Sequence, residues 1–78
     1  MSVTYYVVVP YGRNQEGGLV AGEGQPAPTE AAALSKAEGL STQHVGVAAF
    51  SREANMSTGE FEPAVVIARY GETPDVVE

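Results

Sequence analysis

The chain has 78 residues and no cysteine, and its ten acidic residues against four lysines and arginines give a formal charge of −6 at pH 7. A chain of this length holds one small core, for which assembly with a second copy is a common source of extra stability. The absence of cysteine excludes disulfides, thiolate metal sites and a thiol nucleophile. The negative charge disfavours nucleic acid backbones and anionic membranes as partners, and it favours neutral or basic proteins.

The first predicted element is a strand over residues 3–11, VTYYVVVPY, where nearly every side chain is β-branched or aromatic. Successive residues of a strand point to opposite faces of the sheet, so both faces of this strand are apolar. Pro10 lacks an N–H and is therefore expected at the strand end. The apolar run is too short for a secretory signal or a membrane span and follows no basic leader, which predicts a cytoplasmic protein.

A glycine-rich stretch, GRNQEGGLVAGEG at residues 12–24, lies between this strand and a predicted helix, where nucleotide-binding loops occur. In a Walker loop, lysine and serine or threonine would stand where Gly18 and Leu19 are found. Two glutamates would repel a phosphate, and a proline-containing connector at residues 25–28 separates the glycines from the helix. The stretch therefore predicts turns around a short strand at residues 19–21, and we expect no cofactor.

The segment TEAAALSKAEG at residues 29–39 predicts a short amphipathic helix. Thr29 is the expected N-cap, because its hydroxyl can accept a hydrogen bond from a backbone N–H of the first turn. The stripe that faces the sheet consists mainly of alanine, which allows a close approach but buries little area. Gly39 is expected to end the helix in a left-handed conformation.

Two further strands are predicted at residues 44–52, HVGVAAFSR, and at residues 60–70, EFEPAVVIARY, joined by a hairpin loop that ends in Gly59. The sequence thus predicts the α+β class, with a β-β-α-β-β order, an antiparallel sheet and one short helix packed on one face. We assign residues 1–71 to this single domain and residues 72–78 to a C-terminal tail.

The predicted sheet has an apolar face that the helix cannot cover, because one helix packs on one face only. That face must contact a partner, most simply a second copy of the chain, and we therefore predict a homodimer. Tyrosine combines a large apolar area with a polar tip, which suits such an interface. The candidate interface residues are Tyr6, Tyr70 and Val66.

Residue types that could carry chemistry are few and scattered. His44 is the only histidine, and Ser51, the nearest serine in its predicted strand, is about 23 Å further along. A single histidine without cysteine makes a poor transition-metal site. Glu60 and Glu62 flank a phenylalanine in the alternating pattern of a solvated strand face. We predict no catalytic residue and no metal, and hence a protein that is not an enzyme.

Three arginines, Arg13, Arg52 and Arg69, lie at or near the ends of predicted strands. A sheet could gather them into a corner that binds an anion or a carboxylate. They could instead pair with neighbouring acids such as Glu53 and Glu72. A small-molecule or anion-binding module built on these arginines is therefore the alternative to a protein-interaction module.

Four segments resemble a group of short uncharacterised proteins of alphaproteobacteria and their phages or mobile elements; they are YYVVVPYGR at residues 5–13, GVAAFSR at 46–52, STGE at 57–60 and VIARYGETP at 66–74. The resemblance implies a bacterial or phage source, and it brings no activity and no site residue with it.

The sequence favours a small acidic, non-enzymatic module that binds a protein partner and contacts neither nucleic acid nor membrane directly. By analogy of class alone, one form of such a module is an inhibitor of host machinery carried by a phage or mobile element, such as an anti-CRISPR protein. The anion-binding module stays open beside it at this point.

Overall fold

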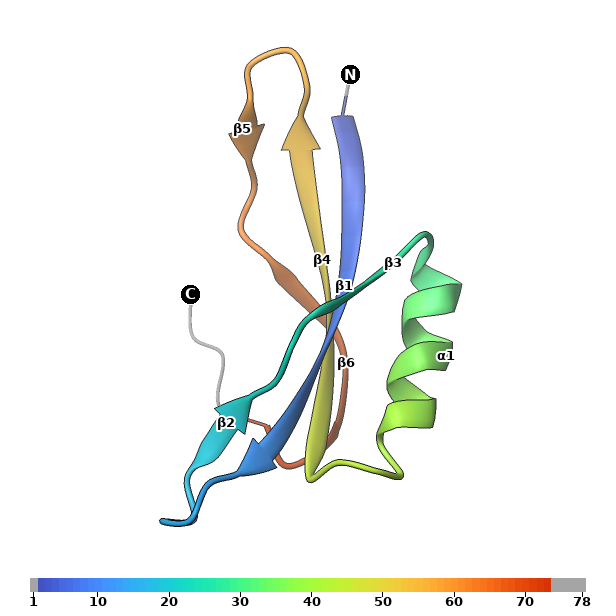
Figure 1. Ribbon diagram of the computed structural model, residues 1–78. Helices are drawn as coiled ribbons and strands as arrows, with labels where there is room; N and C mark the ends of the chain where they lie inside the picture. The colour runs from blue at the N-terminus through green and yellow to red at the C-terminus, as the bar shows by residue number, and fades with distance from the viewer. Residues whose placement is uncertain (1, 74–78) are drawn as a thin grey trace.

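Two long antiparallel strands form the frame of the structure (Figure 1). In the computed structural model, which describes residues 2–73, β1 (Ser2–Arg13) pairs with β4 (Gly46–Asn55) along the whole length of β4. Valine, tyrosine, alanine and phenylalanine are frequent in the paired segments, as expected for strands with apolar residues on both faces. β4 starts two residues later and ends three residues later than the sequence predicted.

Shorter strands complete the sheet on both sides of this pair. β2 (Leu19–Ala21) and β3 (Gln25–Ala27) both pair antiparallel with β1, and β5 (Glu60–Phe61) and β6 (Val65–Gly71) both pair antiparallel with β4. The expected connector at residues 25–28 therefore contains a strand, and the expected strand at 60–70 is two strands. The predicted α+β class with one antiparallel sheet and one helix is confirmed.

Pro10 lies inside β1 and not at its end, so the sequence-based expectation was wrong. Two residues of β1, Val9 and Pro10, lie opposite three residues of the neighbouring edge, 22–24. The extra residue forms a bulge between β2 and β3. The carbonyl of Pro10 accepts a hydrogen bond from the N–H of Gly22 at 2.7 Å. The nitrogen and carbonyl of a strand residue point to the same side, so the missing N–H of Pro10 faces this bulge and no ladder hydrogen bond is lost.

The helix α1 (Glu30–Leu40) connects β3 to β4 and packs on one face of the sheet (Figure 1). The hydroxyl of Thr29 accepts from the N–H of Ala32 at 3.1 Å, which confirms the predicted N-cap. Gly39 does not end the helix in a left-handed conformation. Instead Ser41 donates its N–H to the carbonyl of Ala37, and the hydroxyls of the two residues after the helix bond to carbonyls of the last turn.

The core is small and rich in alanine. Its fully buried members are Val8, Ala33, Ala37, Val47 and Ala49. The two alanines of α1 let the helix approach the centre of the sheet closely, although each buries little area. A helix of eleven residues is marginal by itself in water, so α1 depends on this docking for its stability.

The helix is much shorter than the strands it covers. Eleven residues give a helix of about 16 Å, whereas the twelve residues of β1 extend over about 40 Å. The far ends of β1 and β4 therefore project beyond α1 together with β5, and this projection is visible at the top of Figure 1. We call this part the arm. Within residues 2–73 no helix is long and apolar enough to cross a membrane.

The opposite end of the sheet depends on two glycines that face each other across β4 and β6. Gly71 has a φ of 68° and pairs with Gly46, and the next residue, Glu72, donates its N–H to the carbonyl of Val45 at 3.1 Å. A side chain at Gly46 would overlap the carbonyl of Glu72. Glu72 thus belongs to the folded end of the sheet, while residues 74–78 of the predicted tail lie outside the described residues.

We predict that Gly46→Ala lowers the free energy of unfolding by about 2 kcal/mol, because the two backbones must separate to admit a methyl group. Gly12→Ala is the matched control, since a methyl group at that position of β1 meets no atom within 4 Å. We expect its effect to stay within about 0.5 kcal/mol. Urea denaturation followed by circular dichroism measures both, and equal effects would contradict the close approach.

Candidate functional site: the open face of the sheet

The strand register shows which residues lie on the face of the sheet that points away from α1, here called the open face. Residues directly opposite each other on paired strands share a face, and Val8 with Ala49 lies under the helix. The alternate residues of β1 and β4 therefore lie on the open face. These residues are the pairs Tyr5–Arg52, Val7–Phe50 and Val9–Ala48.

A hollow of about 410 Å³ lies on the open face where the sheet passes into the arm. We call it the aromatic groove, and it is lined by Tyr5, Val7, Phe50, Ser51, Arg52, Phe61 and Ala64. The lining is almost entirely apolar, yet Tyr5 is 48% exposed and Phe61 56% exposed. Large aromatic side chains rarely stay this exposed in a group unless they contact something else.

Arg52 forms one wall of the groove. Its guanidinium carbon lies 4.9 Å from the ring centroid of Phe61, and its Nε donates to the carbonyl of Glu62 at 2.9 Å. The ring of Phe61 is in turn 6.4 Å from the ring of Tyr5, centroid to centroid, with the planes tilted by 34°. Arg52 thus fixes the segment after β5 against β4 and sets the position of the most exposed ring of the groove.

Charge is distributed unequally between the two faces. The basic residues within strands, Arg13, Arg52 and Arg69, all have register positions on the open face, opposite Leu19, Tyr5 and Ala48 respectively. The acidic residues within strands lie on the other face. There Glu53 stands opposite Thr4 and Glu60 opposite Asn55. The open face is therefore apolar and basic in a chain whose total charge is −6.

The predicted interface residues do not share a face. Tyr6 and Tyr70 pack against the core under α1, so their expected position on the uncovered face was wrong. Val66 stands opposite Phe50 and lies on the open face. Val66 and Tyr70 lie on different faces because β6 contains a bulge. Ala68 pairs with Ala49, and Val66 pairs with the next residue of β4, Phe50. Ile67 is therefore an extra residue, and the alternation of side chains between the two faces is reversed from there on.

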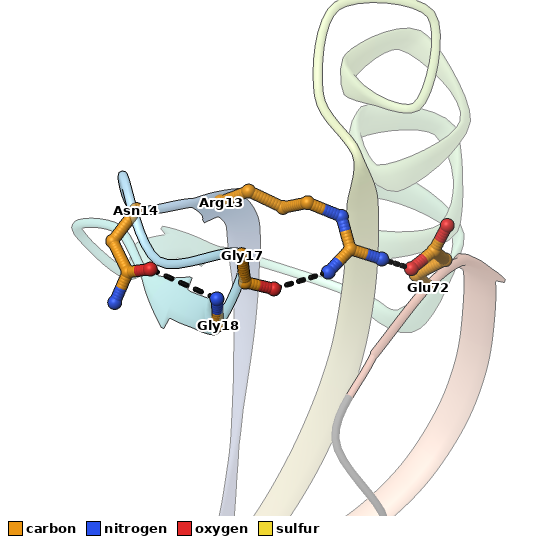
Figure 2. A network of polar contacts seen from close by, with 5 residues as sticks. All are labelled: Arg13, Asn14, Gly17, Gly18 and Glu72. Atoms are coloured by element: carbon orange, nitrogen blue, oxygen red, sulfur yellow. Dashed lines mark hydrogen bonds and ion pairs between the residues drawn. The ribbon is translucent and has the colours of Figure 1, made fainter.

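The structure does not bring the three arginines together into one corner. Arg13 and the residue opposite Arg52, Tyr5, are eight positions apart on β1, or about 26 Å. Arg13 forms an ion pair with Glu72 and donates to the carbonyl of Gly17 (Figure 2). Arg69 is the nearer neighbour of Arg52, four positions away along β4, or about 13 Å.

The glycine-rich stretch forms the predicted turn. The side-chain oxygen of Asn14 accepts the N–H group of Gly18 (Figure 2) and also that of Glu16. Gly17 has a φ of 86°. The N–H of Asn14 also bonds to the carbonyl of Gly18 at 2.9 Å. Because these amides are used inside the turn, they do not point at a common external site as a phosphate loop requires. The turn leads directly into β2, as the sequence predicted.

The other polar candidates are exposed and separate. His44 is an exposed residue of the turn before β4, and Glu60 and Glu62 lie exposed on the arm. No group of three or more histidine, aspartate or glutamate residues in the described part of the chain could hold a metal ion.

Sequence reasoning missed Tyr5 and Phe61 as the exposed rings. The alternation in β1 does separate Tyr5 from the helix face, but only the register between β4 and β5 brings Phe61 beside it. No family model, curated protein or solved structure matches this chain. The open face itself therefore carries the functional argument.

We predict that Arg52→Gln destabilises the chain by about 1 kcal/mol, because it removes the cation from the ring of Phe61 and the hydrogen bond to the carbonyl of Glu62. Arg69→Gln removes the same charge from the same face without these contacts, and we expect a change within about 0.5 kcal/mol. Urea denaturation compares the two. Equal stability of both variants would show that Arg52 does not fix the groove.

Proposed function

We propose that this chain is a non-enzymatic protein-interaction module that binds a partner protein through the aromatic groove of its open face. The observation that carries the proposal is the apolar hollow with two half-exposed rings and an arginine in its wall. Aromatic residues and arginine are the side chains that most often dominate the binding energy of protein interfaces. An inhibitor carried by a phage or mobile element would act in the same way, by covering a surface of its target.

The charge of the open face favours a different protein over the expected second copy. In a symmetric dimer the same patch of both chains meets itself. Such a dimer would bring Arg52 and Arg69 of both chains to one interface, where the strands supply no carboxylate. Like charges that lose their water at an interface cost several kcal/mol unless they are paired.

We therefore predict that the purified chain is monomeric at tens of micromolar. Light scattering after size exclusion should give a mass near the 8.1 kDa of one chain. A mass of two chains that falls to one in Phe61→Ser would identify the second copy as the occupant of the groove and would overturn the proposal.

The binding role is tested by selecting twelve-residue peptides from a random library displayed on phage. We expect peptides that bind the native chain and Met56→Ser but not Phe61→Ser. Met56 is a close control, because it is 57% exposed against 56% for Phe61 and lies in the β4–β5 turn, outside the lining of the groove. If no selected peptide depends on Phe61, the groove is not a protein-binding site.

A further inference from the structure

We infer that the open face recognises an extended, apolar protein segment that carries two carboxylates four residues apart. This inference rests on the proposed function and specifies the partner's chemistry. It reverses the expectation from total charge, which favoured neutral or basic partners. The basis is the separation of charge between the two faces, because a partner meets one face of the sheet and not the average of the molecule.

Arg52 is placed to bind the first carboxylate. Within residues 2–73 its Nε is the nitrogen that donates a hydrogen bond, to the carbonyl of Glu62, and its guanidinium lies over Phe61. The two Nη atoms of an arginine held in this way present parallel N–H groups at the rim of the groove. A carboxylate can accept both in a bidentate, charge-assisted pair, which is the geometry that arginine forms best.

Arg69 is placed to bind the second carboxylate. Along the strands it lies about 13 Å from Arg52, which is the length of four residues in an extended chain. Side chains four residues apart in an extended segment point the same way. The side chain midway between them then lies over Phe50 and Val66, which pair across β4 and β6 and are both apolar. The open face thus fits a five-residue extended segment of the partner with the order acidic, any, apolar, any, acidic.

The third basic residue of the open face does not take part. Arg13 is neutralised by Glu72 and lies about 26 Å along β1 from Tyr5, the residue opposite Arg52. It therefore supplies a matched control, since it is the same residue type on the same face with its charge already paired.

Single-stranded nucleic acid is the competing ligand for a sheet face with exposed rings and arginines. Such binding requires ring faces on which bases stack and a basic groove along the backbone. Here the guanidinium of Arg52 covers the ring of Phe61, and the two arginines beside the groove, Arg52 and Arg69, are about 13 Å apart and form no continuous basic track. Both observations favour the carboxylate-bearing segment.

The test uses the selected peptides that depend on Phe61. We expect aspartate and glutamate to be enriched in them over the input library, most strongly in pairs four residues apart. A synthetic copy of the strongest binder should bind about tenfold more weakly when its acids are changed to amides. Arg52→Gln should weaken the acidic peptide by a larger factor than the amide version, because it removes a charge as well as a wall of the groove. Arg69→Gln should weaken the acidic peptide severalfold and leave the amide version unaffected, whereas Arg13→Gln should change neither.

Three outcomes would overturn the inference. Phe61-dependent peptides without acidic enrichment would leave the groove as a binding site and remove the carboxylate chemistry. Equal sensitivity of the acidic and amide peptides to Arg52→Gln would mean that Arg52 acts by shaping the groove alone. Tighter binding of a fluorescein-labelled random single-stranded RNA of twelve nucleotides than of the acidic peptide would assign the face to nucleic acid.

Discussion

The contact between the alanine face of α1 and the centre of the β1–β4 pair decides which surfaces of this chain are buried. Ala33 and Ala37 bring the helix close to Val8 and Ala49 and leave no room for larger side chains there. A helix of about 16 Å covers less than half of a strand of about 40 Å. The arm and the exposed residues of the open face are therefore left to water or to a partner, and Tyr5, Arg52, Phe61 and Arg69 lie in this uncovered part.

Local signals in the sequence predicted most of the elements, but not β3, the division of residues 60–70 into β5 and β6, or the faces. The cap at Thr29, the glycine-rich turn before β2 and the hairpin before β5 each follow from side chains acting within a few residues. The position of Val66 depends on a bulge, which exists only in the pairing of β6 with β4. The same holds for Phe61, whose ring meets Arg52 through the register of β4 with β5. Such contacts between distant segments leave no periodic trace in the sequence.

Alternation along the two central strands gives the open face its chemistry. A strand that is buried on one side and free on the other places successive residues in different surroundings. In β4, Arg52 and Glu53 are neighbours in sequence, yet they lie on opposite faces and belong to surfaces of opposite character. The total charge of −6 therefore describes neither face, and the charge of a partner does not follow from it alone.

The edges of the sheet also favour binding over the face and not along a strand. A partner strand can extend a sheet only at a regular edge with a continuous row of free backbone groups. On one side the edge is interrupted by the bulge at residues 22–24 and by Pro26 within β3. On the other side β6 carries its own bulge at Ile67, next to a hollow of about 620 Å³ that this edge alone lines. With both edges irregular, the proposed extended segment would lie over the open face, where side chains and not a strand edge would hold it.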